Sequence, residues 1–167
     1  MNKTKRLLIL LGCCIALCLS AWAVKRHYAP KAHIVPMEQG ELIFSLGSTK
    51  TLSWIYEEQT ISLDLTAEEW TFAHDPSCRL SYLSQSDILK AIENVHARRV
   101  IDEPGELSQY GLIPGACTIT TDTGTLVIGD KTAVGGLCYV SVGDGKVYLV
   151  TETILYPFTR SPEQLTQ

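Results

Sequence analysis

Few residues of this sequence could do covalent chemistry. Outside an apolar run near the N-terminus, the candidates are Cys78, Cys117, Cys138, His74 and His96. A cysteine nucleophile needs a histidine within hydrogen-bonding reach and a third group that orients the histidine. His74 precedes Asp75 directly, but adjacent residues in a strand point to opposite faces. A cysteine–histidine hydrolase is therefore the less favoured hypothesis, and we interpret the three cysteines as small buried hydrophobic residues.

Disulfide, metal and cofactor motifs are weak. Cys117 and Cys138 fall in predicted strands that could be neighbours, but three cysteines cannot all pair and none lies in a CxxC motif. The acidic pairs at 57–58 and 68–69 fall in predicted turns rather than across a cleft. The sequence contains no phosphate-binding or dinucleotide-binding fingerprint. We predict no catalytic, cofactor-binding or metal-binding residues, and therefore no enzyme.

One corner of the chain could bind a ligand. In Tyr110-Gly111-Leu112, a glycine stands between two large apolar residues. Such a glycine is typical of backbone with positive φ, which would let Tyr110 and Leu112 both fold inward. This corner is the candidate ligand pocket.

A helix over residues 86–97 is predicted to organise the fold. Its apolar residues at helical spacing are Ile88, Leu89, Ile92 and Val95. Ser84 followed by Asp87 resembles a capping box, and Arg98 with Arg99 would close the last turn, where cations oppose the helix dipole. The apolar stripe needs a partner surface.

Strands are predicted on both sides of this helix. Residues 41–72 alternate apolar and polar side chains, which indicates a meander of short antiparallel strands with one apolar face. Residues 74–76 end the meander, and 77–83 form a connector. After a strand at 99–101 and one helical turn within 102–109, strands are predicted at 117–121, 125–128, 137–142 and 146–151, with turns at 122–124, 129–131 and 143–145. The last two are apolar on both faces, which indicates central strands.

The N-terminus predicts a membrane anchor. Residues 7–24 are 18 residues without a charge, long enough to cross a bilayer as a helix, and the basic residues before them favour a cytoplasmic N-terminus. Cleavage after Ala23 by signal peptidase is the alternative, and lipidation of Cys13 or Cys18 fits less well. The predicted organisation is an anchor or signal sequence at 1–24, a stalk at 25–40, one domain at 41–155 and a tail at 156–167. The predicted fold class is α+β, with antiparallel meanders packed against one main helix and preceded by a single transmembrane helix.

Charge excludes one class of partner. Three of the 14 basic residues precede the apolar run, so 11 Lys and Arg face all 18 Asp and Glu in the rest, which leaves it near −7. An acidic domain lacks the basic face that nucleic-acid binding needs.

The order of these features resembles a bacterial family called domain of unknown function 4340. The matching positions are Trp70 and Phe72, Pro76, and residues 88–95, 97–100, 110–114, 126–130, 139–140 and 147–150. The resemblance covers about residues 41–155. It implies a single-pass protein of the bacterial cell membrane with an extracytoplasmic domain, often near gliding-type ABC transporters. It implies accessory or binding work and supplies no catalytic residues.

The favoured function is therefore an extracytoplasmic interaction module without a cofactor, whose partner is an ABC transporter permease or another envelope protein. A scaffold for cell-envelope assembly is the alternative, with a cysteine–histidine hydrolase as the less favoured one.

Overall fold

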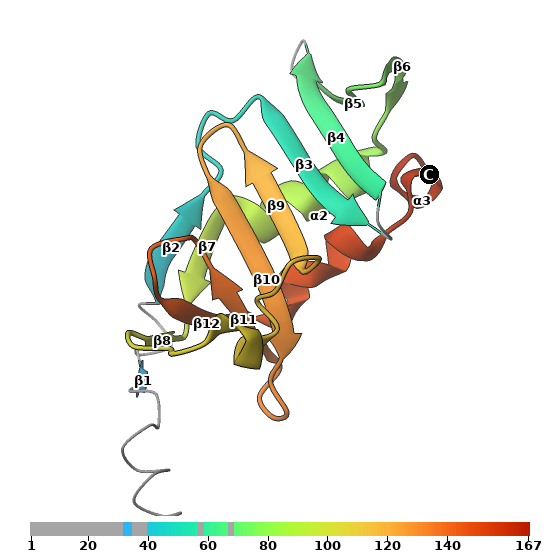
Figure 1. Cartoon of the computed structure of the whole chain (residues 1–167). Helices are drawn as coiled ribbons and strands as arrows, with labels where there is room; N and C mark the ends of the chain where they lie inside the picture. The colour runs from blue at the N-terminus through green and yellow to red at the C-terminus, as the bar shows by residue number, and fades with distance from the viewer. Residues whose placement is uncertain (1–31, 35–39, 57–58, 67–68) are drawn as a thin grey trace, which may run out of the picture. The chain divides into compact units, whose positions relative to one another are not determined.

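The computed structural model describes residues 32–34, 40–56, 59–66 and 69–167 (Figure 1). These residues belong to one compact unit, Lys31–Gln167. The predicted anchor at 1–24 and most of the predicted stalk lie outside them. Within the described part of the chain, no helix is long and apolar enough to cross a membrane.

A ten-stranded antiparallel sheet forms most of the domain, in the order β1-β8-β12-β11-β10-β9-β3-β4-β5-β6. Its strands are β1 (Ala32–Ile34), β3 (Thr51–Tyr56), β4 (Gln59–Thr66), β5 (Glu69–Phe72), β6 (Asp75–Arg79), β8 (Arg99–Ile101), β9 (Cys117–Thr121), β10 (Thr125–Lys131), β11 (Leu137–Ser141) and β12 (Val147–Thr151). β11 and β12 are internal strands, as their apolar sequences predicted. The α+β class and the antiparallel strands are confirmed.

The first predicted strand does not join the meander. β2 (Glu41–Ser45) pairs instead with β7 (Asn94–Ala97) in a separate two-stranded sheet. Phe44 lies opposite Val95 and both are buried, because this ribbon packs its apolar side into the core. The alternation at 41–45 identified a strand, but alternation does not identify the neighbour.

The main helix, α2 (Tyr82–Ile92), begins and ends earlier than predicted. Its N-cap is Ser81, whose Oγ accepts a hydrogen bond from the Ser84 amide at 3.2 Å, and Ser84 itself is buried. After Ile92 the chain enters β7, where burial alternates. Val95 is buried because alternate residues of β7 face the core. It also falls at helical spacing from Ile88 and Ile92, which is why the sequence predicted a longer helix. Arg98 and Arg99 therefore lie beyond the helix.

Two other predicted boundaries change for reasons of pairing. β6 spans the predicted end of the meander and the first residues of the predicted connector, and an ion pair from Arg79 to Glu69 at 2.6 Å joins it to β5. β10 continues through 129–131, where a turn was predicted, and absorbs the irregularity as a register shift between Ile128 and Lys131. Pairing with β11, where Lys131 lies opposite Cys138, carries β10 through this segment, whereas pairing with β9 ends at Ile128.

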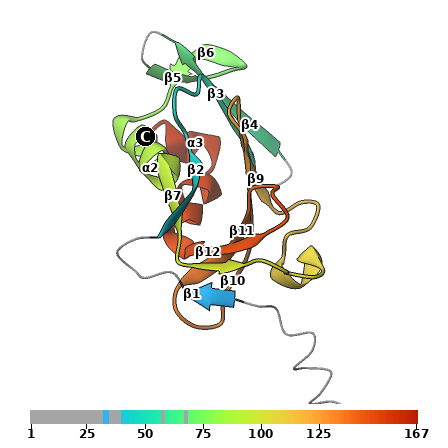
Figure 2. The same ribbon diagram turned by 90° about the vertical axis from the view of Figure 1, so that its left-hand side faces the viewer.

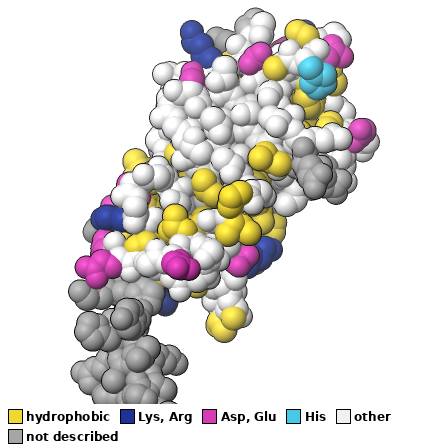
Figure 3. Space-filling view, in the orientation of Figure 1, with side chains coloured by type: hydrophobic (Ala, Val, Ile, Leu, Met, Phe, Trp, Pro, Cys, Tyr) yellow, Lys and Arg dark blue, Asp and Glu magenta, His cyan; other side chains and the backbone are white. Residues whose placement is uncertain are grey.

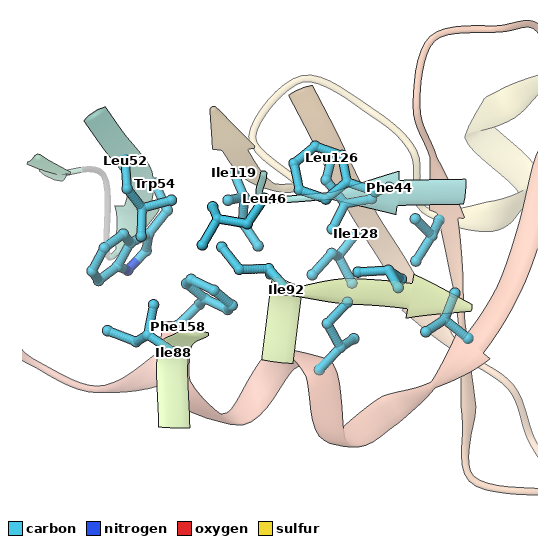
Figure 4. Packing of buried hydrophobic residues seen from close by; sticks show 14 of the residues in the cluster. Phe44, Leu46, Leu52, Trp54, Ile88, Ile92, Ile119, Leu126, Ile128 and Phe158 are labelled. Carbon is cyan, nitrogen blue, oxygen red and sulfur yellow. The ribbon is translucent and has the colours of Figure 1, made fainter. Parts of the chain in front are cut away.

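The helices cover one face of the large sheet (Figure 2). Besides α2 they are η2 (Glu152–Thr159) and α3 (Pro162–Leu165). The Phe158 ring meets the Trp54 ring edge to face at 5.3 Å, and Ile88 and Ile92 of α2 pack beside it (Figure 4). Leu165 of α3 is fully buried in the same cluster. Residues 156–167, predicted as a tail, therefore close the core, and the domain does not end at 155.

The other face of the sheet is polar over β3, β4 and β9, as the alternation predicted for β3 and β4. Ser53 lies opposite Ser62 on one side and Thr120 on the other, and Thr120 lies opposite Thr125. Figure 3 shows this face with few charged side chains, while hydrophobic side chains gather in its lower half. A second, smaller apolar cluster lies there, under η1 (Leu107–Tyr110).

Candidate functional site

Two of the three cysteines, Cys117 and Cys138, have thiols whose pKa is raised by burial. Cys117 on β9 and Cys138 on β11 flank β10, so their strands are not neighbours. Both are free thiols, and burial raises the pKa of each to about 11. A thiol that holds its proton at neutral pH is a poor nucleophile. Cys138 is fully buried, which confirms the interpretation of this residue as a small hydrophobic one.

Cys78 lies in a different environment. It lines a cavity of about 200 Å³ together with His74 of the β5–β6 turn and Glu163 of α3. The His74 ring packs against Phe72 at 5.5 Å, and none of the hydrogen bonds in the described part of the chain joins His74 to Cys78. Cys78 and His74 thus line the same cavity, but they lack the hydrogen bond that would activate the thiol.

The carboxylates near this cavity are engaged elsewhere. Asp75 Oδ1 accepts hydrogen bonds from the Ser77 hydroxyl at 2.6 Å and the Ser77 amide at 3.1 Å, and these bonds lower the pKa of Asp75. A hydrogen bond from Ser161 likewise lowers the pKa of Glu163. The cavity therefore holds a thiol and an imidazole without an evident orienting group among the described residues.

The predicted corner has the predicted backbone. Gly111 has φ 69°, Tyr110 is buried, and Leu112 packs against the smaller apolar cluster. The Tyr110 hydroxyl donates to the Pro104 carbonyl at 3.0 Å, and its ring lies 4.9 Å from that of Tyr139. Tyr110, Gly111 and Leu112 are absent from the linings of three cavities on the described part of the chain. Ligand binding at this corner stays a prediction.

Gly129 of β10 lets the loop at 110–112 pack directly against the sheet. A Cβ atom at Gly129 would overlap the carbonyl oxygen of Tyr110, and one at Gly111 would overlap Asp130. The two glycines thus let η1 and β10 approach closely. The geometry attaches this loop to the sheet.

The largest of the three cavities lies on the helical face. It measures about 330 Å³ and adjoins another of about 220 Å³, with Lys90, Ala91 and Thr153 lining both. We call the two together the α2–η2 groove, after the helices that line the larger cavity. Tyr156, which is 49% exposed, and Pro157 give it an apolar wall at one end.

Two polar contacts hold this end of the groove. Arg160, which follows η2, places Nη2 2.8 Å from Asp87 Oδ2 of α2 and so ties the two helices together. Lys131 Nζ lies 5.5 Å from the centre of the Tyr156 ring and 3.5 Å from Glu152 Oε2. Tyr156 is therefore supported on one side by a cation.

The other end of the groove is formed by β7 and the residues after it. His96 is exposed, and its Nδ1 lies 2.9 Å from the Gly40 carbonyl oxygen, so this nitrogen carries the proton. Arg98 is half-buried, and its amide donates to the Leu149 carbonyl at 2.8 Å. The charged residues that line the groove are thus Lys90, Arg98, Arg160 and Asp87.

Sequence reasoning did not propose this groove. The arginines after β7 were interpreted as the end of a helix, and residues 156–160 as part of a tail. The run Tyr156-Pro157-Phe158, unusually apolar for a tail, was the signal that could have indicated a packed segment. Nothing local could have placed it beside α2.

Comparison with known proteins gives one match. A family model described as Domain of unknown function (DUF4340) matches residues 56–166. The matched segment contains all of α2, η2 and α3, and so both walls of the groove. No curated protein and no solved structure matches the chain.

Proposed function

We propose, from the premise that this chain belongs to the family described as Domain of unknown function (DUF4340), that it is a binding module whose α2–η2 groove receives a partner. The observation that carries the proposal is the groove itself: an open surface channel with three basic side chains and an exposed aromatic ring. Tyrosine and arginine, which the groove presents as Tyr156, Arg98 and Arg160, are among the side chains enriched at protein interfaces.

The uncharged run at 7–24 supports the proposal that the module is anchored in a membrane. We propose that it forms a single transmembrane helix and that the domain stands outside the cytoplasmic membrane of a bacterium. The partner would then be a membrane or envelope protein, with an ABC transporter permease as the first candidate and components of cell-envelope assembly as the second. In this proposal the module binds its partner without transforming it.

Site-specific photo-crosslinking tests the groove as the contact surface. A benzophenone side chain replaces Tyr156 in the full-length chain, expressed in intact bacterial cells. A second variant carries the same group at Ile55, which is 40% exposed on β3 and is absent from the groove lining. We expect a discrete crosslinked product from position 156 and none from position 55. Products of equal yield from both positions, or none from 156, contradict the proposal.

The identity of the crosslinked product separates the two kinds of partner. A permease in the product supports the transporter hypothesis, whereas wall-polymer fragments support the assembly scaffold. Either product leaves the groove as the binding site.

A hydrolase is the less favoured alternative function, and the observation behind it is that Cys78 and His74 line one cavity. It predicts that Cys78→Ser abolishes an activity without unfolding the domain. Cys117→Ser is the matched control, because burial raises the pKa of that thiol to about 11. If an activity survives Cys78→Ser, the hydrolase hypothesis is wrong.

A further inference from the structure

We infer that the α2–η2 groove selects an acidic peptide segment, an inference that rests on the proposed function and specifies its ligand. The starting point is a local reversal of charge. Beyond the N-terminal apolar run the chain carries 11 basic and 18 acidic residues, yet the groove is lined by Lys90, Arg98 and Arg160 against Asp87 alone. A peptide rich in carboxylates would meet its opposite charge here.

The paired charges leave Lys90 as the main attracting group. Arg160 is engaged by Asp87 at 2.8 Å, and this pair neutralises itself. Lys90 is exposed, lines both halves of the groove, and has no ion-pair partner among the described residues. Its position at the centre of the groove lets it meet a ligand that extends toward either end. A carboxylate at Lys90 would form the first contact.

The size of the groove favours a peptide over a small anion. The two cavities measure about 330 and 220 Å³, more space than an inorganic ion fills. Tyr156 and Pro157 offer an apolar surface against which the aliphatic parts of a peptide can pack. Thr151 and Thr153 add hydroxyl groups along the wall. Several consecutive residues of an extended segment can therefore be held at once.

A peptide titration with the full-length chain in detergent micelles tests the inference. The probe is a short fluorescein-labelled peptide of alternating Glu and Gly, followed by fluorescence anisotropy at low salt, where exposed charges are least screened. Matching Lys-Gly and Ser-Gly peptides are the comparison ligands. We expect the acidic peptide to bind most tightly and the Lys-Gly peptide to bind about tenfold more weakly, since opposite and like charges at one contact differ by roughly that factor. The uncharged Ser-Gly peptide loses only the attraction and should bind up to about fivefold more weakly.

Two charge reversals locate the contact. Lys90→Glu is expected to weaken binding of the acidic peptide about tenfold, because an attraction becomes a repulsion. Lys50→Glu makes the same change in net charge at an exposed residue between β2 and β3, outside the groove lining, and should leave binding nearly unchanged. Thermal unfolding followed by circular dichroism checks that both variants are folded.

Several results would overturn the inference. They are equal losses for the two variants, equal binding of the three peptides, no binding at all, or displacement of the acidic peptide by an equal concentration of inorganic phosphate. The crosslink at position 156 separates this failure from failure of the proposed function. If the crosslinked product forms and excess acidic peptide does not lower its yield, the groove is still a binding site. The inference that its ligand is acidic is then wrong.

Discussion

Phe158 provides the sharpest test of whether the last residues of the chain belong to the core. Its side chain is 2% exposed and meets the Trp54 ring edge to face at 5.3 Å. Replacement of a buried phenylalanine by alanine removes its transfer free energy and leaves a cavity, which together cost about 3–5 kcal/mol. The change Phe158→Ala should therefore lower the free energy of unfolding by that amount.

The surroundings of the ring give no reason to lower this expectation. Trp54 Nε1 is buried and has no hydrogen-bond partner among the described residues. One N–H group does not hold a water molecule in a cavity lined by apolar side chains, so the space left by the phenyl ring should stay empty. We therefore expect the full loss of about 3–5 kcal/mol. Domains of this size are stable by about 5–15 kcal/mol, so the variant should still fold.

Urea unfolding of the full-length chain, followed by tryptophan fluorescence, measures the loss. With a slope of about 2 kcal/mol per molar urea, the midpoint should fall by roughly 1.5–2.5 M. Tyr156→Ala is the control on the same helix, because that ring is 49% exposed. Loss of this half-exposed ring and of its contact with Lys131 should cost only about 1 kcal/mol. If Phe158→Ala costs under about 1 kcal/mol, the C-terminal segment does not pack against the sheet as described.

Three further predictions concern the backbone, the helix start and the thiols. Gly129→Ala should destabilise the domain by about 1–3 kcal/mol, because the added methyl group would overlap a backbone carbonyl of η1. Gly124→Ala is the control and should be nearly neutral, because its Cβ would lie 3.6 Å from an aromatic ring. Equal urea midpoints for the two variants would refute the account. Ser81→Ala should cost about 1 kcal/mol through the lost N-cap, and an unchanged midpoint would contradict that assignment. Stability should fall as the pH rises from about 9 to about 11, because burial raises the pKa of Cys138 and the folded chain keeps a proton that the unfolded chain releases. Above that range the loss from this thiol is about 3 kcal/mol, and Cys138→Ala should show a correspondingly smaller fall; equal slopes in the two proteins would refute it.

Features that depend only on residues close together in the sequence could be predicted without the structure. Alternation along 51–56 and 59–66 predicted strands because successive side chains point to opposite faces, whatever the partner strand is. The positive φ of Gly111 follows from glycine between two large apolar residues that both turn inward. The family resemblance also rested on local motifs in order, and the family match at 56–166 confirms it.

The errors share one cause. Val95 suited both a helical and a strand pattern, and only its pairing with Phe44 of β2 decides that it lies in a strand. In the same way, the sequence at 129–131 permits a turn, and pairing with β11 makes it the continuation of β10. Pairing is a contact between distant segments, so periodicity within one segment cannot reveal it.

The sequence by itself determined the local conformations, the acidic balance, the uncharged N-terminal run and the family. Tertiary structure alone decided that Phe158 and Leu165 enter the core and that Arg160 meets Asp87, 73 residues away in the chain. The α2–η2 groove exists only because these two segments pack together. The reason is physical: an apolar stripe shows that a surface will be buried, but the shape and energy of the packed core select which surface buries it.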